Sequence, residues 1–122
     1  MIIYCDGGCR GNGTENPECY GSYKIDNGVP VLTEFPTLKT NNQAEYQSLI
    51  TVLKMLLDKP NDQEVTIKID SALVYYQLMG RWKIKNDALR ELYRQAHTLF
   101  QETDNVALTL ISGAEMKWVL GH

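Results

Sequence analysis

The feature that most limits the fold of this chain is the order of its apolar segments. Some of these segments have the residue pattern of a strand and others have the spacing of a helix. Residues 2–5 form a short apolar run that ends in Asp6, after which the glycines at positions 7, 8, 11 and 13 predict a turn. Residues 20–25 and 31–35 flank an Asp-Asn-Gly turn at residues 26–28. A strand-like run followed by two more runs around such a turn predicts a strand and then a hairpin. We therefore expect three adjacent antiparallel strands at the start of the chain.

A helix and a fourth strand are predicted after the hairpin. Across residues 43–57 the apolar side chains recur at helical spacing, and Asn41 or Asn42 can cap the start of this helix. Residues 65–69 then alternate between apolar and polar side chains, which predicts a strand that ends at Asp70.

Two further helices and a last strand are predicted in the second half of the chain. Residues 71–79 predict a short helix that stops at Gly80. Asn86 or Asp87 can cap a longer helix with an apolar stripe, and residues 106–111 predict the last strand.

The end of the chain and the overall order complete the expected architecture. Apolar residues in the segment 114–120 recur at helical spacing, which makes the order βββαβααβα. The economical fold for this order is α/β, a five-stranded mixed sheet flanked by helices. No internal repeat or linker is visible, so we expect one domain spanning residues 1–122.

The charge and the apolar content limit the classes of protein that are possible. The chain has no apolar run of about 18 residues, which a membrane-spanning helix needs. We therefore expect a soluble, cytoplasmic protein with no membrane contact and no obligate protein partner. The net charge of −3 argues against binding nucleic acid through bulk positive charge, so any such contact must be local.

The three cysteines favour reduced thiols. Cys5, Cys9 and Cys19 are neither an even set nor a set with convincing zinc-ligand spacing. Reduced thiols in the cytoplasm are the simpler interpretation.

Three acidic residues occupy positions from which they can meet. Asp6 and Asp70 each follow an apolar strand, and Glu45 lies in the first turn of the first predicted helix. Three carboxylates crowded together repel one another unless cations lie between them, and oxygen-rich sites suit Mg²⁺ or Mn²⁺. Two such ions support phosphodiester hydrolysis. Taken singly, the same residues also suit a turn, a helix dipole and a helix cap, so position alone does not decide between these interpretations.

Three segments resemble the ribonuclease H family. They are YCDGGCRGNG at residues 4–13, TNNQAEY at residues 40–46 and IDS at residues 69–71, in this order along the chain. One Asp-Gly-Gly would be weak, but all three segments in the predicted strands and helices are a specific signal. The resemblance implies an endonuclease that hydrolyses the RNA strand of an RNA–DNA hybrid, in the compact form of the family without a basic protrusion.

The resemblance also implies roles for particular residues. Asp6, Glu45 and Asp70 match metal ligands of a site for two Mg²⁺ or Mn²⁺ ions. The residues that match substrate contacts fall into two groups: Asn12, Asn41 and Asn42 at RNA 2′-hydroxyls, and Lys39, Thr40 and Asn86 at a phosphate of the DNA strand. The basic stretch at residues 81–85 directly precedes Asn86 and offers nearby charge and a flat aromatic ring. Helix caps and solvated charges remain the alternative interpretation of these residues.

The end of the chain departs from the family pattern. The family brings a fourth carboxylate on its last helix, but no aspartate follows Asp104. In one interpretation residues 118–122 are a strand-to-loop segment with a mobile histidine, and the chain stops before its last helix. In the other, which we favour, residues 106–111 are already the last strand, the tail is the final helix, and His122 replaces the missing aspartate as catalytic metal ligand. A frayed histidine without a role is a third possibility.

Two other functions compete with hybrid cleavage. One is an integrase-like nuclease of the same fold, which the TNNQ segment at residues 40–43 and the lack of a second domain disfavour. The other is a non-catalytic module that binds hybrids through a degraded metal site. Metal-dependent cleavage of a hybrid separates these alternatives.

Overall fold

The computed structural model describes residues 1–59 and 62–121 of the chain. Its elements in chain order are β1 (Ile2–Arg10), β2 (Glu18–Ile25), β3 (Val31–Glu34), α1 (Asn41–Asp58), β4 (Val65–Ile69), α2 (Ala72–Leu78), α3 (Asp87–Glu102), β5 (Val106–Leu110) and α4 (Gly113–Leu120). This is the order βββαβααβα that the sequence predicts, so the expected α/β fold with a mixed five-stranded sheet is confirmed.

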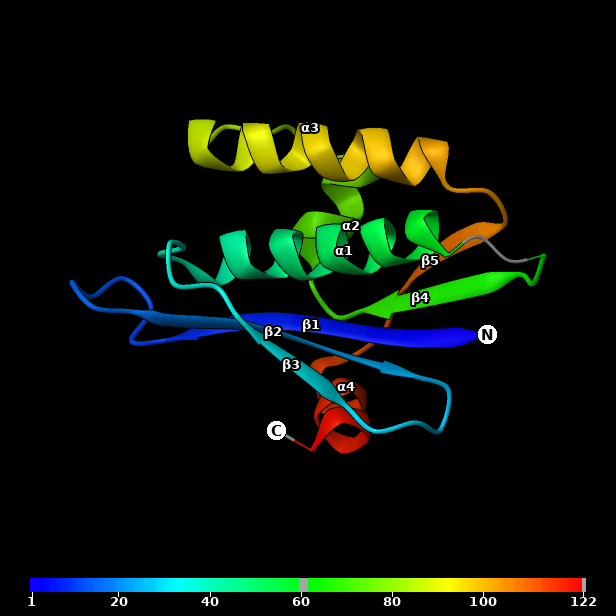
Figure 1. The fold of residues 1–122 in the computed structure, drawn as a ribbon. Helices are drawn as coiled ribbons and strands as arrows, with labels where there is room; N and C mark the ends of the chain where they lie inside the picture. The colour runs from blue at the N-terminus through cyan, green and yellow to red at the C-terminus, as the bar shows by residue number, and fades with distance from the viewer. Residues whose placement is uncertain (60–61, 122) are drawn as a thin grey trace.

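The sheet is antiparallel on one side and parallel on the other. Its strand order is β3-β2-β1-β4-β5, with β1, β2 and β3 antiparallel and β1, β4 and β5 parallel. Helix α1 packs on one face of the sheet with α2 beside it, α3 lies over α1 as an outer layer, and α4 covers part of the opposite face (Figure 1). Strand β1 at the centre of the sheet therefore contacts helices on both faces.

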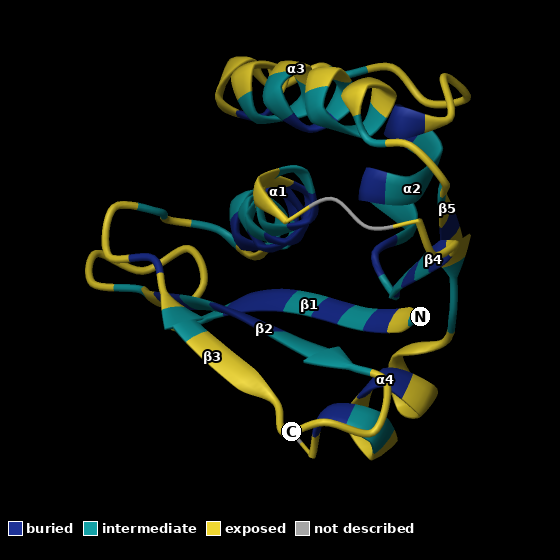
Figure 2. Cartoon of the chain, turned by 45° about the vertical axis from the view of Figure 1, so that its right-hand side comes forward, coloured by how far each residue is buried: buried dark blue, intermediate teal, exposed yellow. Residues whose placement is uncertain are grey.

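The core lies between α1 and the sheet. Figure 2 shows buried surface on α1 and along β1, whereas β3 and the outer side of α3 are exposed. The fully buried side chains in this layer are Ile3, Tyr46, Leu49, Ile50, Val52, Leu53 and Ile67. Burial of these apolar side chains is the main force that fixes α1 against β1.

Strand β1 is longer than the sequence predicts. We expected it to end in Asp6, followed by a glycine turn that starts at Gly7, but Gly7 and Gly8 continue the ladder with β2. Gly7 is required for packing, because a β-carbon there would lie 2.3 Å from the carbonyl oxygen of Ala44 on α1. The turn comes later, at Gly11, whose φ of 70° suits glycine. The predicted turn is therefore present at Gly11 and Gly13, whereas its placement directly after Asp6 is wrong.

The cap of α1 also differs from the prediction. Thr40 is the N-cap, because its hydroxyl accepts a hydrogen bond from the main-chain N–H of Gln43 while the Gln43 side chain accepts one from Thr40. This reciprocal capping box starts the helix earlier than expected. Asn41 and Asn42 are thus the first helical residues, and Glu45 lies in the second turn instead of the first.

The other helix ends follow the sequence more closely. Asn86 caps α3, and Ser71 caps α2. Gly80 has a φ of 77° just after α2, as expected for a residue that stops a helix. Ser112 caps α4, and Gly121 ends it in the left-handed conformation. The interpretation of the tail as a helix is therefore confirmed, whereas His122 lies outside the described residues.

One prediction about the cysteines is wrong. Cys9 and Cys19 form a disulfide, and Cys5 is a buried free thiol. The two bonded residues are direct partners in the β1–β2 ladder. Spacing along the sequence does not show this pairing, because it depends on the register of the two strands.

In the described parts of the chain no helix is long and apolar enough to cross a membrane. The expected cytoplasmic location stays a prediction.

Candidate active site

The register of two parallel strands brings Asp6 and Asp70 together. Strands β1 and β4 pair Tyr4 with Lys68, and each aspartate comes two residues after its member of this pair. Glu45 approaches from α1, whose close contact with β1 depends on Gly7. One carboxylate oxygen from each of the three acids lies within 4.8 Å of the others. The structure therefore brings together the three acids that the sequence singled out.

Burial and mutual repulsion perturb the acids of this cluster. The pKa of Asp6 is raised to about 7 by burial and then by the charge of Asp70. Burial also raises the pKa of Glu45 to about 7, with smaller contributions from the charges of Asp70 and Asp6, although a hydrogen bond with Ser71 opposes the change. A nearby cation would favour the ionised form of these carboxyl groups and so lower their pKa values.

The donor set fits a hard divalent cation. Three carboxylates, from β1, from α1 and from the residue after β4, converge within 4.8 Å. Oxygen ligands of this kind suit Mg²⁺ or Mn²⁺. Among the described residues no fourth acid joins this group. The acid on α4, Glu115, is exposed and lies outside the cluster.

A serine that the sequence did not single out joins Asp6 to the helix that carries Glu45. The buried hydroxyl of Ser48 donates to the main-chain carbonyl oxygen of Asp6 at 2.6 Å and lies 3.2 Å from the Cys5 sulfur. Ser48 follows Glu45 by three residues, so both are on neighbouring positions of α1. The signal in the sequence was a polar residue within an apolar helical stripe.

A second group of predicted residues surrounds a hollow of about 300 Å³ near the start of α1. Its lining residues are Asn12, Thr40, Asn41, Asn42, Gln43, Asn86 and Leu89. Five of the six predicted substrate contacts are thus in one place. Lys39 does not line this hollow, and its main-chain N–H donates to the Gln43 side chain.

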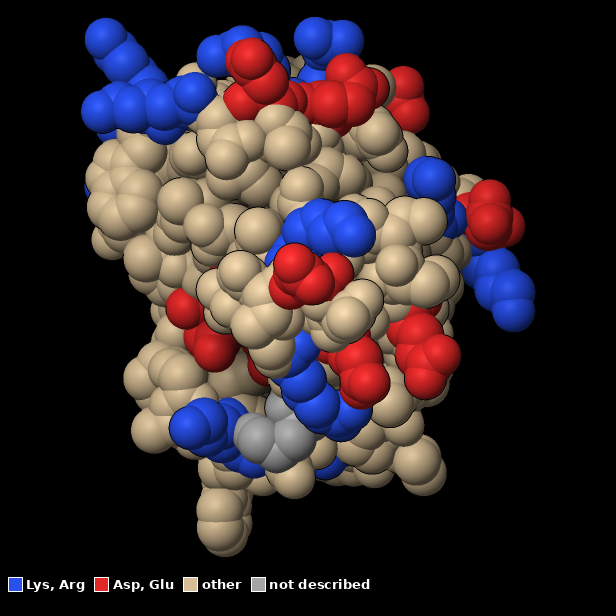
Figure 3. Space-filling view, turned by 90° about the vertical axis from the view of Figure 1, so that its left-hand side faces the viewer, with Lys and Arg blue, Asp and Glu red and all other residues tan. Residues whose placement is uncertain are grey.

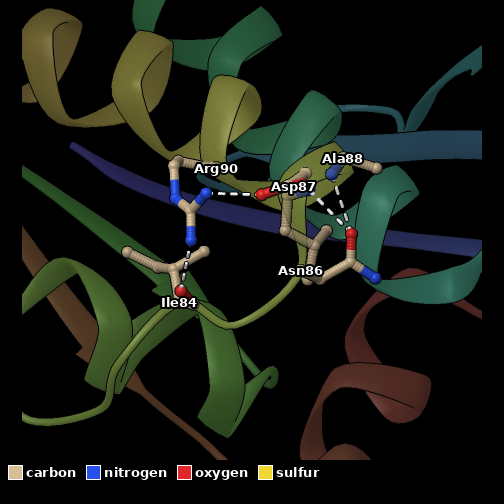
Figure 4. Close-up of polar contacts among 6 residues, drawn as sticks. Ile84, Asn86, Asp87, Ala88 and Arg90 are labelled. Carbon is tan, nitrogen blue, oxygen red and sulfur yellow. Dashed lines mark hydrogen bonds and ion pairs between the residues drawn. The ribbon is translucent and has the colours of Figure 1, made fainter.

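The side-chain oxygens of Asn12, Asn41 and Asn86 in this hollow already have partners. The oxygen of Asn41 accepts from the main-chain N–H of Cys9 at 2.7 Å, and that of Asn12 accepts from the main-chain N–H of Asn41 at 2.8 Å. Asn86 accepts from the N–H groups of Ala88 and Leu89 as the cap of α3 (Figure 4). These contacts leave the amide NH₂ groups as the donors that each side chain offers.

The basic stretch at residues 81–85 follows α2 and is held from the core. Tyr46 donates to the buried Gln77 side chain, which donates in turn to the main-chain oxygen of Lys83. Trp82 is 48% exposed and lies against Tyr76, with ring centroids 4.8 Å apart. The ring is therefore accessible rather than part of the core.

The surface charge around this region is mixed. Figure 3 shows the left-hand side of Figure 1, where the N-terminal ends of α1 and α3 lie, and acidic and basic side chains alternate across it. No single basic field covers this face, which agrees with the net charge of −3. Contacts with an anionic ligand here depend on individual donors.

Relatives of known sequence share most of this chain. Ribonuclease HI of Halobacterium salinarum is 32% identical over 114 residues, which cover 91% of this chain and 56% of that protein. The bifunctional protein Rv2228c of Mycobacterium tuberculosis is 37% identical over 103 residues, which cover 81% of this chain and 28% of that protein. The chain thus spans about a quarter to a half of the length of these relatives.

Solved structures share the fold. RNase H1 from Halobacterium salinarum superposes with a TM-score of 0.77 at 28% identity and covers 95% of this chain and 88% of that one. LC11-RNase H1 in complex with an RNA/DNA hybrid gives 0.75 at 29% identity, with 97% and 89% covered. The sequence also matches the RNase H family over residues 1–122. With the fold and the three acids in place, this match shows that the chain belongs to the RNase H family.

Proposed function

We propose that residues 1–122 form one metal-dependent ribonuclease H domain, which hydrolyses the RNA strand of RNA–DNA hybrids. The observation that carries this proposal is the convergence of Asp6, Glu45 and Asp70 within 4.8 Å. The complex of LC11-RNase H1 with an RNA/DNA hybrid supports the choice of substrate, because that protein has the same fold.

Asp6, Glu45 and Asp70 would hold the cofactor, two Mg²⁺ or Mn²⁺ ions. Two divalent ions in such a site supply an activated water and neutralise the charge on the phosphate. The three side chains come from β1, α1 and the end of β4, so the packed core holds them in place. This arrangement orients the carboxylates before substrate binds, which limits the cost of reorganisation.

The hollow near the start of α1 would distinguish RNA from DNA. Asn12, Asn41 and Asn42 would contact ribose 2′-hydroxyls. The oxygens of Asn12 and Asn41 already accept hydrogen bonds within the protein, so these two residues would contact the hydroxyls through their NH₂ groups. Lys39, Thr40 and Asn86 would contact a phosphate of the DNA strand. Lys39 would reach this phosphate from outside the hollow.

His122 is our proposal for the fourth ligand. An imidazole ligand suits Mn²⁺ better than Mg²⁺, so cleavage should be faster with Mn²⁺. His122→Ala should weaken metal binding measured by calorimetry. Unchanged affinity and unchanged metal preference in this variant would remove the proposed ligand and leave the three carboxylates.

A cleavage assay tests the proposed function. A hybrid with a labelled RNA strand should be cut with Mg²⁺ or Mn²⁺ and left intact with a chelator, whereas duplex DNA of the same sequence stays uncut and single-stranded RNA is cut poorly. The matched control is Asp70→Asn, which keeps the size of the side chain but removes the charge, so that cleavage nearly vanishes.

Other outcomes identify the competing functions. Cleavage of duplex DNA at a comparable rate would favour an integrase-like nuclease. Tight hybrid binding without cleavage under any metal condition would favour a non-catalytic module, for which the absence of a fourth acid among the described residues is the supporting observation.

A further inference from the structure

The disulfide lies at the base of the loop that carries Asn12. Cys9 is the second-to-last residue of β1, and Cys19 is the second residue of β2. The two residues are direct partners in the ladder between these strands. The bond therefore closes the loop formed by residues 10–18. Closing a loop covalently restricts the positions that its residues can take.

A short relay of hydrogen bonds connects this disulfide with two predicted substrate contacts. The main-chain N–H of Cys9 donates to the Asn41 side chain at 2.7 Å, and the main-chain N–H of Asn41 donates to the Asn12 side chain at 2.8 Å. A shift of the strand at Cys9 would thus change the orientation of both amides.

The ion pair across the base of the loop adds little to the main-chain ladder, which pairs Arg10 with Glu18. The ion pair between Arg10 and Glu18 is 3.6 Å long, and both side chains are about three-quarters exposed. Exposed pairs of this kind contribute little to stability. The hydroxyl of Thr14 bonds to Gly11 within the loop itself and does not reach the sheet. The disulfide therefore adds a covalent restraint to the main-chain ladder at this point.

We propose that the Cys9–Cys19 pair is a redox-sensitive positioning element that sets the affinity for the hybrid through Asn41 and Asn12. This inference rests on the proposed function. In the oxidised protein the side-chain amides of Asn12 and Asn41 are fixed in the orientation that binds the hybrid. In the reduced protein the loop moves, so the affinity for the hybrid falls. The metal cluster at Asp6 is not part of the relay, so the rate at saturating hybrid changes little.

The redox step balances as a thiol–disulfide exchange. Two cysteine thiols lose two protons and two electrons as the sulfur–sulfur bond forms, and a low-molecular-weight disulfide such as glutathione disulfide is reduced to two thiols. Attack begins at Cys9, which is half-buried, because Cys19 is only 5% exposed. Cys5 is fully enclosed in the core and does not compete.

Steady-state cleavage kinetics test the proposal. The protein is equilibrated with glutathione disulfide or with dithiothreitol, and the disulfide content is checked by thiol titration. We expect KM for the hybrid to rise about fivefold on reduction while kcat stays within about twofold. The Cys9→Ser/Cys19→Ser variant should behave like the reduced protein under both conditions.

Two further variants separate positioning from general destabilisation. Asn12→Ala/Asn41→Ala binds more weakly, but its KM should no longer depend on the redox state, because the relay is gone. Val106→Ala, in a strand remote from the loop, should lower the melting temperature and keep the redox effect. A redox effect on KM that persists in the double asparagine variant overturns the proposal, as does an equal KM for the oxidised and reduced proteins.

Amide hydrogen exchange gives a readout that does not depend on cleavage. Exchange at the N–H groups of Cys9 and Asn41 should be slower in the oxidised protein than in the reduced protein. If neither form cuts or binds the hybrid, the proposed function fails, whereas this exchange difference still reports on the relay. Equal exchange rates in the two redox states overturn the relay itself.

Discussion

The hydroxyl of Ser48 donates to the main-chain carbonyl oxygen of Asp6 at 2.6 Å, which joins α1 to β1 beside the acidic cluster. Glu45 lies three residues earlier on the same helix. One partly buried hydrogen bond therefore helps to set the distance between two acids that belong to different elements.

Removing this hydroxyl should affect both stability and metal binding. Ser48→Ala leaves the Asp6 carbonyl without this buried donor, so the free energy of unfolding should fall by about 1–2 kcal/mol in urea. Calorimetry should show weaker Mg²⁺ binding, because Asp6 and Glu45 are less well positioned. The matched control is Thr51→Ala, whose hydroxyl donates to the main-chain oxygen of Gln47 within α1. Equal Mg²⁺ affinity in wild type and Ser48→Ala would contradict the positioning role.

The metal-free protein should lose stability as the pH rises from about 4 to about 7. In the unfolded chain Asp6 and Glu45 ionise near 3.8 and 4.5, but in the folded protein the pKa of each is about 7. Between these values the folded state binds more protons, so the free energy of unfolding falls with pH. The contribution is fully present below about pH 4 and is lost as the pH passes 7.

Urea unfolding at a series of pH values with a chelator present measures this effect. The Asp6→Asn/Glu45→Gln variant serves as the control and should show a shallower decline, because other groups titrate in both proteins. Mg²⁺ affinity should rise across the same window, since the metal displaces protons from both acids. A decline of equal slope in the control would show that these two residues do not cause it.

The donor role of Asn41 can be tested without removing its acceptor. Asn41→Asp keeps an oxygen for the N–H of Cys9 but loses the NH₂ group. A carboxylate is also favourable near the N-terminus of α1, so stability should be unchanged or slightly higher. Hybrid affinity, measured by fluorescence anisotropy in the Asp70→Asn background, should fall about tenfold or more.

The control for this substitution is Gln101→Glu, which makes the same change of charge at an exposed position near the end of α3. It should bind the hybrid like the parent protein. Equal losses of affinity in the two variants would attribute the effect to net charge rather than to the lost donor.

The order of the elements could be predicted because periodicity and turn residues are local properties of the sequence. The acids of the cluster could be singled out because Asp6 and Asp70 follow apolar strand residues at equivalent positions. Whether they meet depends on the register between β1 and β4, which the sequence does not specify locally. The convergence was therefore a hypothesis until the fold was known.

The features that the sequence did not predict are contacts between distant segments. The extension of β1 through Gly7 depends on how closely α1 approaches, and the disulfide depends on the alignment of Cys9 with Cys19. The bond from Ser48 to Asp6 joins residues that are 42 positions apart. Each arises from packing between elements, for which a single sequence carries little signal.

The start of α4 offers a position for the carboxylate that the cluster lacks among the described residues. A β-carbon at Gly113 would lie 3.6 Å from a carboxylate oxygen of Asp70, an ordinary contact distance. Gly113 is the first residue of α4, where an acidic side chain is favourable. The β-carbon of an aspartate at this position would therefore lie beside Asp70 without a close contact.

Gly113→Asp should bind Mg²⁺ more tightly, because a fourth negative charge adds to the attraction for the cation. In the metal-free protein the same charge adds to the repulsion, so the melting temperature should fall with a chelator and recover with Mg²⁺. Gly113→Asn, which has the same size without the charge, is the control and should leave Mg²⁺ affinity unchanged. Tighter binding in both variants would point to helix stabilisation, whereas tighter binding in neither would show that the start of α4 does not face the metal site.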